Sequence, residues 1–263
     1  MPPKRPVFSI IVAVRDNTVH LLPFTLDSII AQSFEPYEII IIDGQTKEHS
    51  LQVFNAYRSH ISRIYSALDC NLFAMFNKGI SLAHGEYLHF LVPGEFYLSR
   101  QSFSFMWEFI QTQSSPDLVY TGSIVRHSLS PPQTLFQQIT EETLKGAKIS
   151  LSLTSYWFRK EALLMLGNFN TRYRYQGGFD LVCRFYNAIS LRKSFLRRIL
   201  TDYEYRLSSP KVILRQLLEI LVAIFCYFGF STAVLWWLAQ NHLRFIQWWI
   251  KCLKGAFWRK SPA

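Results

Sequence analysis

The chain has 263 residues, of which 49% are hydrophobic, 17% charged and 16% aromatic, and its formal net charge is +10 at pH 7. This composition excludes a disordered protein and fits one domain of ordinary size with an appendage. The excess of positive charge indicates an anionic partner, which leaves phosphate, acidic lipid and nucleic acid as candidates.

The first ninety residues alternate between short apolar runs and helical patterns. Strands are expected over 8–14, 38–42, 63–66 and 87–91, and helices over 17–30, 51–60 and 71–83. The run FSIIVAV is rich in β-branched residues, as in a strand buried on both faces. Strands that alternate with helices predict an α/β fold with a mostly parallel central sheet flanked by helices.

The second half continues with mixed elements and then changes in character. We expect a helix over 103–113, a strand over 117–120, a loop over 128–133, a strand that leads into a helix over 156–166, and a helix over 180–188. Beyond residue 210, lysines and arginines flank a long apolar stretch. The sequence therefore predicts one domain over 1–208 and a hydrophobic, amphipathic tail over 209–263.

Other chemistries find little support in the sequence. The cysteines form no CxxC pair, the histidines show no HxH or HExxH spacing, and the chain has no GxxxxGK[ST] or GxGxxG loop. This argues against a zinc site, a disulfide framework, a nucleoside triphosphatase and a dehydrogenase. The start MPPKRP lacks the pattern of a signal peptide, which predicts a cytoplasmic chain.

Polar residues follow three of the expected strands. Arg15 follows the first strand, Asp43 ends the second, and Glu95 follows the fourth. In open α/β sheets ligands bind beyond the carboxyl ends of the strands. Asp43 can accept hydrogen bonds from a base or ribose, and Glu95 can ligate a divalent cation, Mn²⁺ or Mg²⁺, that neutralises a pyrophosphate. The alternative is that these residues merely form turns.

Four blocks, in order and at matching spacing over residues 7–205, resemble family 2 glycosyltransferases, which have the GT-A fold. The blocks read FSIIVAVRDN…LDSIIAQSFEPYEIIIIDG, NLFAMFNKGISLAHGEYLHFL, SLTSYWFRKEALLMLGNFN and FDLVCRFYNA. The resemblance implies inverting transfer of a sugar from a nucleoside diphosphate sugar to a polysaccharide or glycolipid acceptor. It also implies a metal-held diphosphate and a carboxylate that deprotonates the acceptor.

The resemblance assigns roles to individual positions. It implies that Asp43, Asp69, Asn77 and Arg15 contact the nucleotide sugar and that Glu95 contacts the metal. The chain departs from the family pattern at four places. After the fourth strand, VPGE offers one carboxylate where the family has the aspartates of N-S-D-D, and Gly178 stands at the position of the catalytic aspartate. Ala74 replaces the aspartate of Y-D-A-M, and residues 44–48 replace G-G-S-T-D.

These departures leave two hypotheses. In one, the chain is a transferase in which Asp180 or Glu95 acts as the base, or the acceptor supplies its own ionisable group. In the other, it is a catalytically inactive relative that binds or scaffolds. Asp180 also has a structural interpretation as the partner of Arg184, four residues further along a helix.

The tail has two features typical of membrane proteins. Residues 220–239 form an uncharged run of about bilayer length, interrupted by Gly229, Ser231 and Thr232. Residues 240–254 place cations and tryptophans as in a basic helix that lies in a membrane interface. We predict attachment to the anionic inner face of the cell membrane, ahead of a single span and of a helix pair that packs on protein. The basic residues 192–198 are then better explained by lipid than by nucleic acid.

Overall fold

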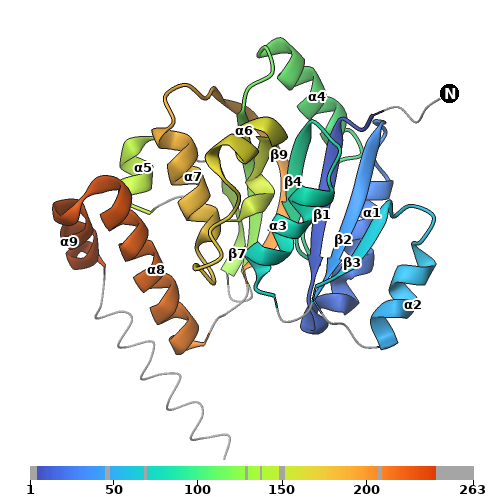
Figure 1. The fold of residues 1–263 in the computed structure, drawn as a ribbon, viewed down its shortest axis with the longest axis horizontal. Helices are drawn as coiled ribbons and strands as arrows, with labels where there is room; N and C mark the ends of the chain where they lie inside the picture. The colour runs from blue at the N-terminus through green and yellow to red at the C-terminus, as the bar shows by residue number, and fades with distance from the viewer. Residues whose placement is uncertain are drawn as a thin grey trace, which may run out of the picture. The chain divides into compact units, whose positions relative to one another are not determined.

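The computed structural model describes residues 5–44, 48–67, 70–127, 130–136, 138–147, 152–205 and 209–240. The chain divides into two compact units. The larger unit comprises Met1–Thr140 and Ile149–Leu207, and the smaller comprises Glu141–Lys148 and Ser208–Ala263. The strands and most helices lie in the larger unit (Figure 1).

Four parallel strands form one half of the sheet, as the sequence predicts. They are β1 (Phe8–Val14), β2 (Tyr37–Asp43), β3 (Arg63–Ser66) and β4 (Tyr87–Leu91), in the spatial order β3-β2-β1-β4. All seven residues of β1 are buried, which confirms that this strand is covered on both faces.

The sheet then continues with strands of mixed direction. β4 pairs antiparallel with β8 (Tyr156–Arg159), and the order runs on through β6 (Leu118–His127), β9 (Lys193–Tyr205) and the short β5 (Phe96–Tyr97). β6 extends well past the predicted end at residue 120, and the sequence did not predict β9. The α/β fold with a central, largely parallel sheet is confirmed.

The loop predicted over 128–133 is wrong in part. Residues Ser130–Leu135 form β7, which pairs antiparallel with β6 and lies off the main strand order. Prolines at 131 and 132 are compatible with this position because an edge strand needs only one ladder of hydrogen bonds.

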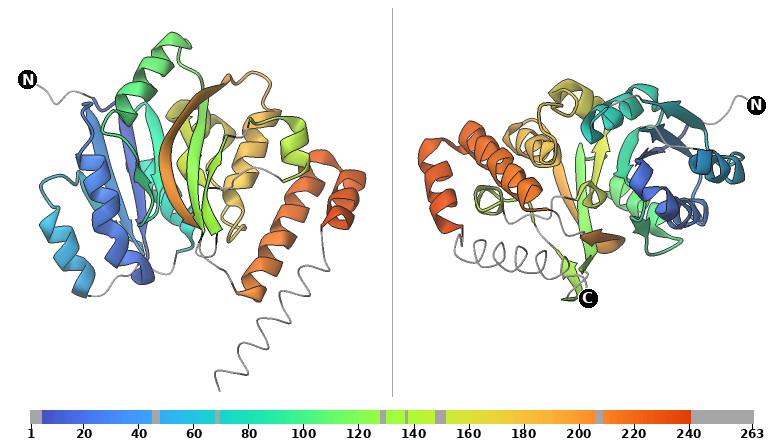
Figure 2. Two further views of the ribbon diagram at one scale, coloured as in Figure 1. Left: turned by 180° about the vertical axis from the view of Figure 1, so that it is seen from behind. Right: turned by 90° about the horizontal axis from the view of Figure 1, so that it is seen from below.

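Helices cover both faces of the sheet (Figures 1 and 2). On one face lie α1 (Leu22–Ile30), which follows the 3₁₀ turn Asp16–Leu21, and α4 (Ser102–Thr112); on the other lie α3 (Leu72–Leu82) and α7 (Gly177–Asn187). The remaining helices of this unit are α2 (Glu48–Ala56) and α6 (Lys160–Leu166). α3 approaches β1 closely, since a Cβ added at Gly79 would lie 2.3 Å from Cγ2 of Ile11.

A buried carboxylate joins three strands at the amino edge of the sheet. Oε1 of Glu38 accepts hydrogen bonds from the hydroxyl of Ser9 at 2.6 Å and from the backbone N–H of Gly85 at 3.2 Å. Burial alone would raise the pKa of Glu38, but the hydrogen bonds from Ser9 and His84 outweigh it and lower the pKa. The ionised carboxylate therefore ties the starts of β1, β2 and β4 together.

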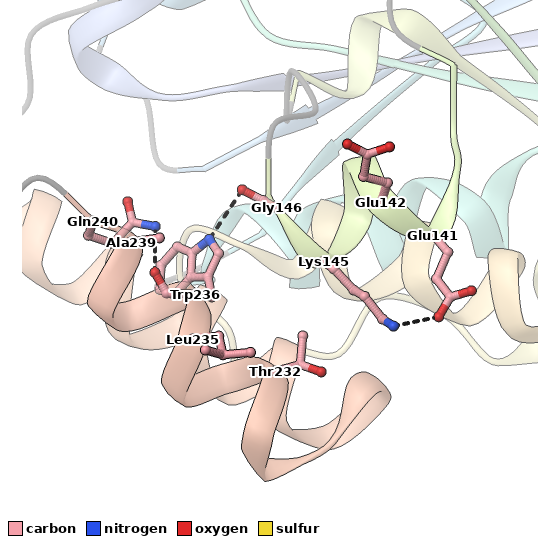
Figure 3. A pocket seen from close by; sticks show the side chains of 9 residues that line it. All are labelled: Glu141, Glu142, Lys145, Gly146, Thr232, Leu235, Trp236, Ala239 and Gln240. Atoms are coloured by element: carbon pink, nitrogen blue, oxygen red, sulfur yellow. Dashed lines mark hydrogen bonds and ion pairs between the residues drawn. The ribbon is translucent and has the colours of Figure 1, made fainter.

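The smaller unit contains three described helices: α5 (Glu141–Lys145), α8 (Pro210–Phe228) and α9 (Phe230–Ala239). The indole N–H of Trp236 donates to the carbonyl of Gly146 at 3.2 Å, and Lys145 pairs with Glu141 at 2.6 Å (Figure 3). These residues line a cavity of about 870 Å³ between α5 and α9. One side of α9 is therefore turned toward α5.

Gly229 divides the apolar run 220–239 into two helices. It adopts φ +86°, ψ 171° between α8 and α9, a left-handed value of φ that favours glycine. Within the described ranges, no helix combines the length and the apolar composition that crossing a membrane requires. The basic amphipathic helix predicted over 240–254 lies outside these ranges, except for Gln240.

A buried imidazole projects into the core from the centre of β4. The sequence places His89 on a strand, where alternation predicts a half-buried side chain, but the residue is completely buried. Its Nε2 donates to the carbonyl of Thr154 at 2.9 Å, its Nδ1 accepts from the hydroxyl of Tyr97, and its ring stacks on Trp157 with centroids 4.2 Å apart. Burial lowers the pKa of His89 to about 3.

This pKa predicts acid sensitivity. In the unfolded chain the imidazole titrates near pH 6.5, so between pH 6.5 and 3 the unfolded state binds one proton more than the folded state. The free energy of unfolding should therefore fall as pH falls from 6.5, by up to about 1.4 kcal/mol per pH unit from this group. Urea unfolding of the wild type and of His89→Phe between pH 7 and 5 measures it. In the variant, the free energy of unfolding should fall less steeply with pH than in the wild type. Equal pH dependence in both proteins would contradict a buried, neutral His89.

Candidate functional site

Strand register brings the predicted acidic residues to one edge of the sheet. β1 lies between β2 and β4; Val14 pairs with Asp43 on one side and Val12 pairs with Leu91 on the other. Neighbouring strands lie about 4.8 Å apart, so the ends of β2 and β4 are separated by roughly 10 Å. Asp43 and the turn that carries Glu95 therefore flank the end of β1, where the chain continues with Arg15.

Asp43 is a buried residue at the end of β2, with 6% of its surface exposed. Backbone hydrogen bonds fix its position: Gly44 donates to the carbonyl of Val14 at 2.9 Å, and Ala67 donates to that of Asp43 at 2.7 Å. A Cβ at Gly44 would lie 3.1 Å from Cε of Met75, so the glycine allows β2 to end close to α3. Arg15 is exposed beside this strand end.

Glu95 closes the turn that follows β4. Its Oε2 accepts from the backbone N–H of Val92 at 2.8 Å, and its Oε1 accepts from the hydroxyl of Ser152 at 3.2 Å. Gly94 has φ +97° and donates to the hydroxyl of Thr25 at 2.9 Å. These two hydrogen bonds hold the carboxylate in one orientation.

Glu95 alone provides too few ligands for a divalent cation, so a cation at this position would also need phosphate oxygens as ligands. Among the described residues, no three His, Cys, Asp or Glu side chains gather as a metal site. Mg²⁺ commonly binds proteins through one or two carboxylates, with substrate phosphates and water completing its shell. Glu95 can supply the one protein carboxylate that such a site needs.

Asn77 and Asn71 hold α3 against the segment after α6. The side-chain amide of Asn77 donates to the carbonyl of Phe169 at 2.8 Å, and its oxygen accepts from the N–H of the same residue at 2.9 Å. Asn71 caps α3 through Ala74 N–H and donates to the carbonyl of Thr171 at 2.7 Å. These contacts indicate a positioning role for Asn77. Its predicted contact with the nucleotide stays a prediction, and Asp69 lies outside the described ranges.

Asp180 forms the predicted ion pair in the first turn of α7. The side chain is buried, and its Oδ2 accepts from Nη2 of Arg184 at 3.0 Å. Arg184 also donates to the carbonyls of Leu166, Gly167 and Asn168. The pair therefore anchors α7 to the end of α6. This is the structural interpretation of Asp180, and its role as a catalytic base stays a prediction.

Small residues open α7 where the resemblance expects a catalytic carboxylate. Gly177 and Gly178 are both buried. A Cβ at Gly177 would lie 2.8 Å from the ring of Phe73, so the helix start packs directly on α3. Gly178 offers no group that can take a proton.

Some of the basic residues in 192–198 make contacts within the protein. Arg192 donates to the carbonyl of Ser115, and Lys193 donates to those of Tyr186 and Ala188. The guanidinium of Arg198 lies 4.0 Å from the ring centroid of Phe105.

Sequence reasoning missed Ser152, which orients Glu95 from a position 57 residues further along the chain. The segment that carries Ser152 is anchored to the core, because the carbonyl of Thr154 accepts hydrogen bonds from buried His89 and from the hydroxyl of Thr201, the latter at 3.1 Å. No local pattern marks a lone serine for such a role.

Comparison with known proteins identifies relatives in sequence. Residues 9–91 match the family model for glycosyl transferase family 2. The PGL/p-HBAD biosynthesis glycosyltransferases of Mycobacterium bovis and Mycobacterium tuberculosis are each 25% identical to this chain over 203 residues, which cover 75% of this chain and 77% of theirs.

Solved structures share the fold. S. aureus TarS 1–349 in complex with UDP-GlcNAc matches with a TM-score of 0.66 at 17% identity, over 83% of this chain and 66% of that one. The mannosyltransferase PcManGT from Pyrobaculum calidifontis, in complex with GDP-Man and Mn²⁺, matches with a TM-score of 0.58 at 14% identity, over 85% and 64%. This chain thus spans about two thirds of each of those chains.

The ion pair of α7 can be tested by a double-mutant cycle. Asp180→Ala and Arg184→Ala each remove one member of the ion pair, in which Asp180 is buried and Arg184 partly buried, so each should destabilise the fold. The double variant should lose less than the sum, with a coupling of about 1–3 kcal/mol in urea unfolding. Additive losses would contradict the structural role. A stable Asp180→Asn that has lost only transferase activity would instead support a catalytic base.

Proposed function

We propose that this chain, a glycosyltransferase of the family 2 type by sequence match and by GT-A fold, transfers a sugar from a nucleoside diphosphate sugar to an acceptor hydroxyl with inversion. The acceptor belongs to a surface polysaccharide or a glycolipid. One observation carries the proposal: strand register sets Asp43 and the end of β4, which leads into the turn with Glu95, on either side of β1 at the carboxyl edge of the sheet.

Each residue of this edge has a distinct task in the proposal. Asp43 accepts hydrogen bonds from the base or ribose, and Arg15 offers a cation beside the diphosphate. Glu95 provides the carboxylate for Mn²⁺ or Mg²⁺, which supplies charge neutralisation of the departing diphosphate when bound. Ser152 fixes the orientation of Glu95, as hydrogen-bond partners of metal ligands commonly do.

Deprotonation of the acceptor is the step for which the described part of the chain has no evident general base. Gly178 carries no carboxylate, Asp180 is paired with Arg184, and Glu95 is bonded to Val92 and Ser152. A missing general base costs about 10²–10⁴-fold in rate. We therefore propose an acceptor that brings its own ionisable hydroxyl, which lowers the need for a base from the protein.

These engaged side chains also favour a second candidate, a catalytically inactive relative that binds or scaffolds. The two candidates differ in what they require of the sheet edge. A transferase must bind a nucleoside diphosphate together with a cation, whereas a scaffold has no need to do so.

Calorimetric titration with UDP and GDP, with and without Mn²⁺, tests the proposal. The wild type should bind one of the two more tightly in Mn²⁺. Glu95→Gln should remove most of that gain, because a neutral amide is a much weaker cation ligand, and Asp43→Asn should weaken binding by about tenfold with or without the metal, as expected for one charge-assisted hydrogen bond.

A matched control is Glu86→Gln, which makes the same change just before β4, at the opposite edge of the sheet. It should leave both affinities unaltered. If the folded wild type fails to bind either nucleotide at millimolar concentration, the scaffold candidate is favoured over the transferase.

We further propose that residues 209–263 hold the protein at the anionic inner face of the cell membrane, where a lipid-linked acceptor is available. Residues 241–263 support this, since they contain five lysines and arginines, three tryptophans and no acidic residue.

Fractionation of cells that express the chain tests this attachment. The full chain should sediment with membranes, and high salt should weaken the association, because the attraction to anionic lipid is screened. Deletion of residues 210–263 should move it to the soluble fraction. The same distribution before and after the deletion would rule the attachment out.

A further inference from the structure

Two stripes of exposed apolar side chains run along α8 and α9. On α8 the stripe recurs every three or four residues, so its members lie on one side of the helix; on α9 the exposed apolar residues again share one side. The members are Leu214, Leu218, Val222 and Phe225 on α8, and Phe230, Val234, Leu235 and Leu238 on α9. Phe230 and Leu238 are the most exposed of these, at 71% and 70%.

A groove joins the two stripes. It has a volume of about 390 Å³, and every residue that lines it is apolar, among them Val222, Phe225, Phe230 and Leu238. The opposite side of α9 is occupied, since Trp236 is buried and hydrogen-bonded to Gly146 (Figure 3). The exposed stripes are therefore the outward face of the smaller unit, and we call these eight residues the apolar face.

The charges on α8 and α9 and in the residues that follow them are mostly positive. α9 carries no charged residue, and the single carboxylate of α8, Glu219, pairs with Arg215 at 3.3 Å. The next residues in the chain, 241–263, add Arg244, Lys251, Lys254, Arg259 and Lys260 without an acidic residue. An apolar surface followed by a purely cationic segment requires a partner that offers both hydrocarbon and negative charge.

We propose that the apolar face is the surface by which the smaller unit enters an anionic bilayer, with α8 and α9 lying in the interface. The acyl region accepts Phe225, Phe230 and Leu238, and the headgroups accept the following cations. This inference rests on the membrane attachment proposed above and adds to it the surface that inserts. A purely apolar protein helix on the same groove would satisfy the apolar side chains but not the cations.

Flotation with vesicles tests the proposal on the full-length chain. The wild type should float with vesicles of phosphatidylglycerol and phosphatidylcholine and much less with phosphatidylcholine alone. The double variant Phe230→Ser, Leu238→Ser should lower the partition into anionic vesicles at least tenfold, because it removes two side chains that would be buried in the bilayer. Both residues are exposed, so the variant should remain folded.

The matched control is Met165→Ser, Ile189→Ser. It replaces two large apolar residues of the other unit that are 75% and 96% exposed, outside the apolar face. Its partition should equal that of the wild type. An equal loss in both double variants would mean that general surface hydrophobicity drives binding, and it would overturn the assignment to this face.

Two other results would also overturn it. A second copy of the chain on the apolar face would give a dimer without vesicles in analytical ultracentrifugation, and Phe230→Ser, Leu238→Ser would dissociate it. If residues 241–263 cover the face instead, the double variant would float like the wild type. In that case, loss of flotation on deletion of residues 210–263 would still support membrane attachment by the tail. It would reject only the proposal that the apolar face inserts into the bilayer.

Discussion

The parallel pairing of β1 with β2 on one side and β4 on the other is the constraint on which the candidate site depends. Because the three strands run in the same direction and in fixed register, the residues that follow them meet at one edge. Glu38 secures the opposite edge through Ser9 and Gly85. A one-residue slip of β2 would turn the side chain of Asp43 to the other face of the sheet.

Many of the polar side chains that the sequence assigns to the site are engaged by the protein itself. Glu95 accepts hydrogen bonds from Val92 and Ser152. Asn77 is hydrogen-bonded to the backbone of Phe169, and Asp180 forms an ion pair with Arg184. Such contacts orient side chains before a ligand arrives, which lowers the cost of binding. They also stabilise the architecture without a ligand, so the same geometry serves a slow enzyme and a binding protein. Binding of a nucleoside diphosphate is therefore the property that separates the two.

The parts of the fold that could be predicted are those with a local signal. β1 and β2 are continuous apolar runs because both faces are buried, and the Asp180–Arg184 spacing of four residues already indicates a pair. β7 carries two prolines and β9 carries many polar residues, and their pairing within the sheet makes them strands. The contact of Ser152 with Glu95 likewise depends on tertiary structure, and a local pattern cannot contain it.

Gly229 decides how the apolar residues of the smaller unit can be used. A continuous helix over 220–239 would be about 30 Å long, the thickness of a bilayer core. The left-handed φ at Gly229 ends α8 and starts α9 in a new direction, so the same residues form two shorter helices, each with a buried and an exposed side. Neither helix combines the length and the apolar composition of a membrane span, but their exposed sides can lie in the surface of a bilayer. The position of one glycine thus turns a segment with the composition of a span into a candidate for interfacial binding.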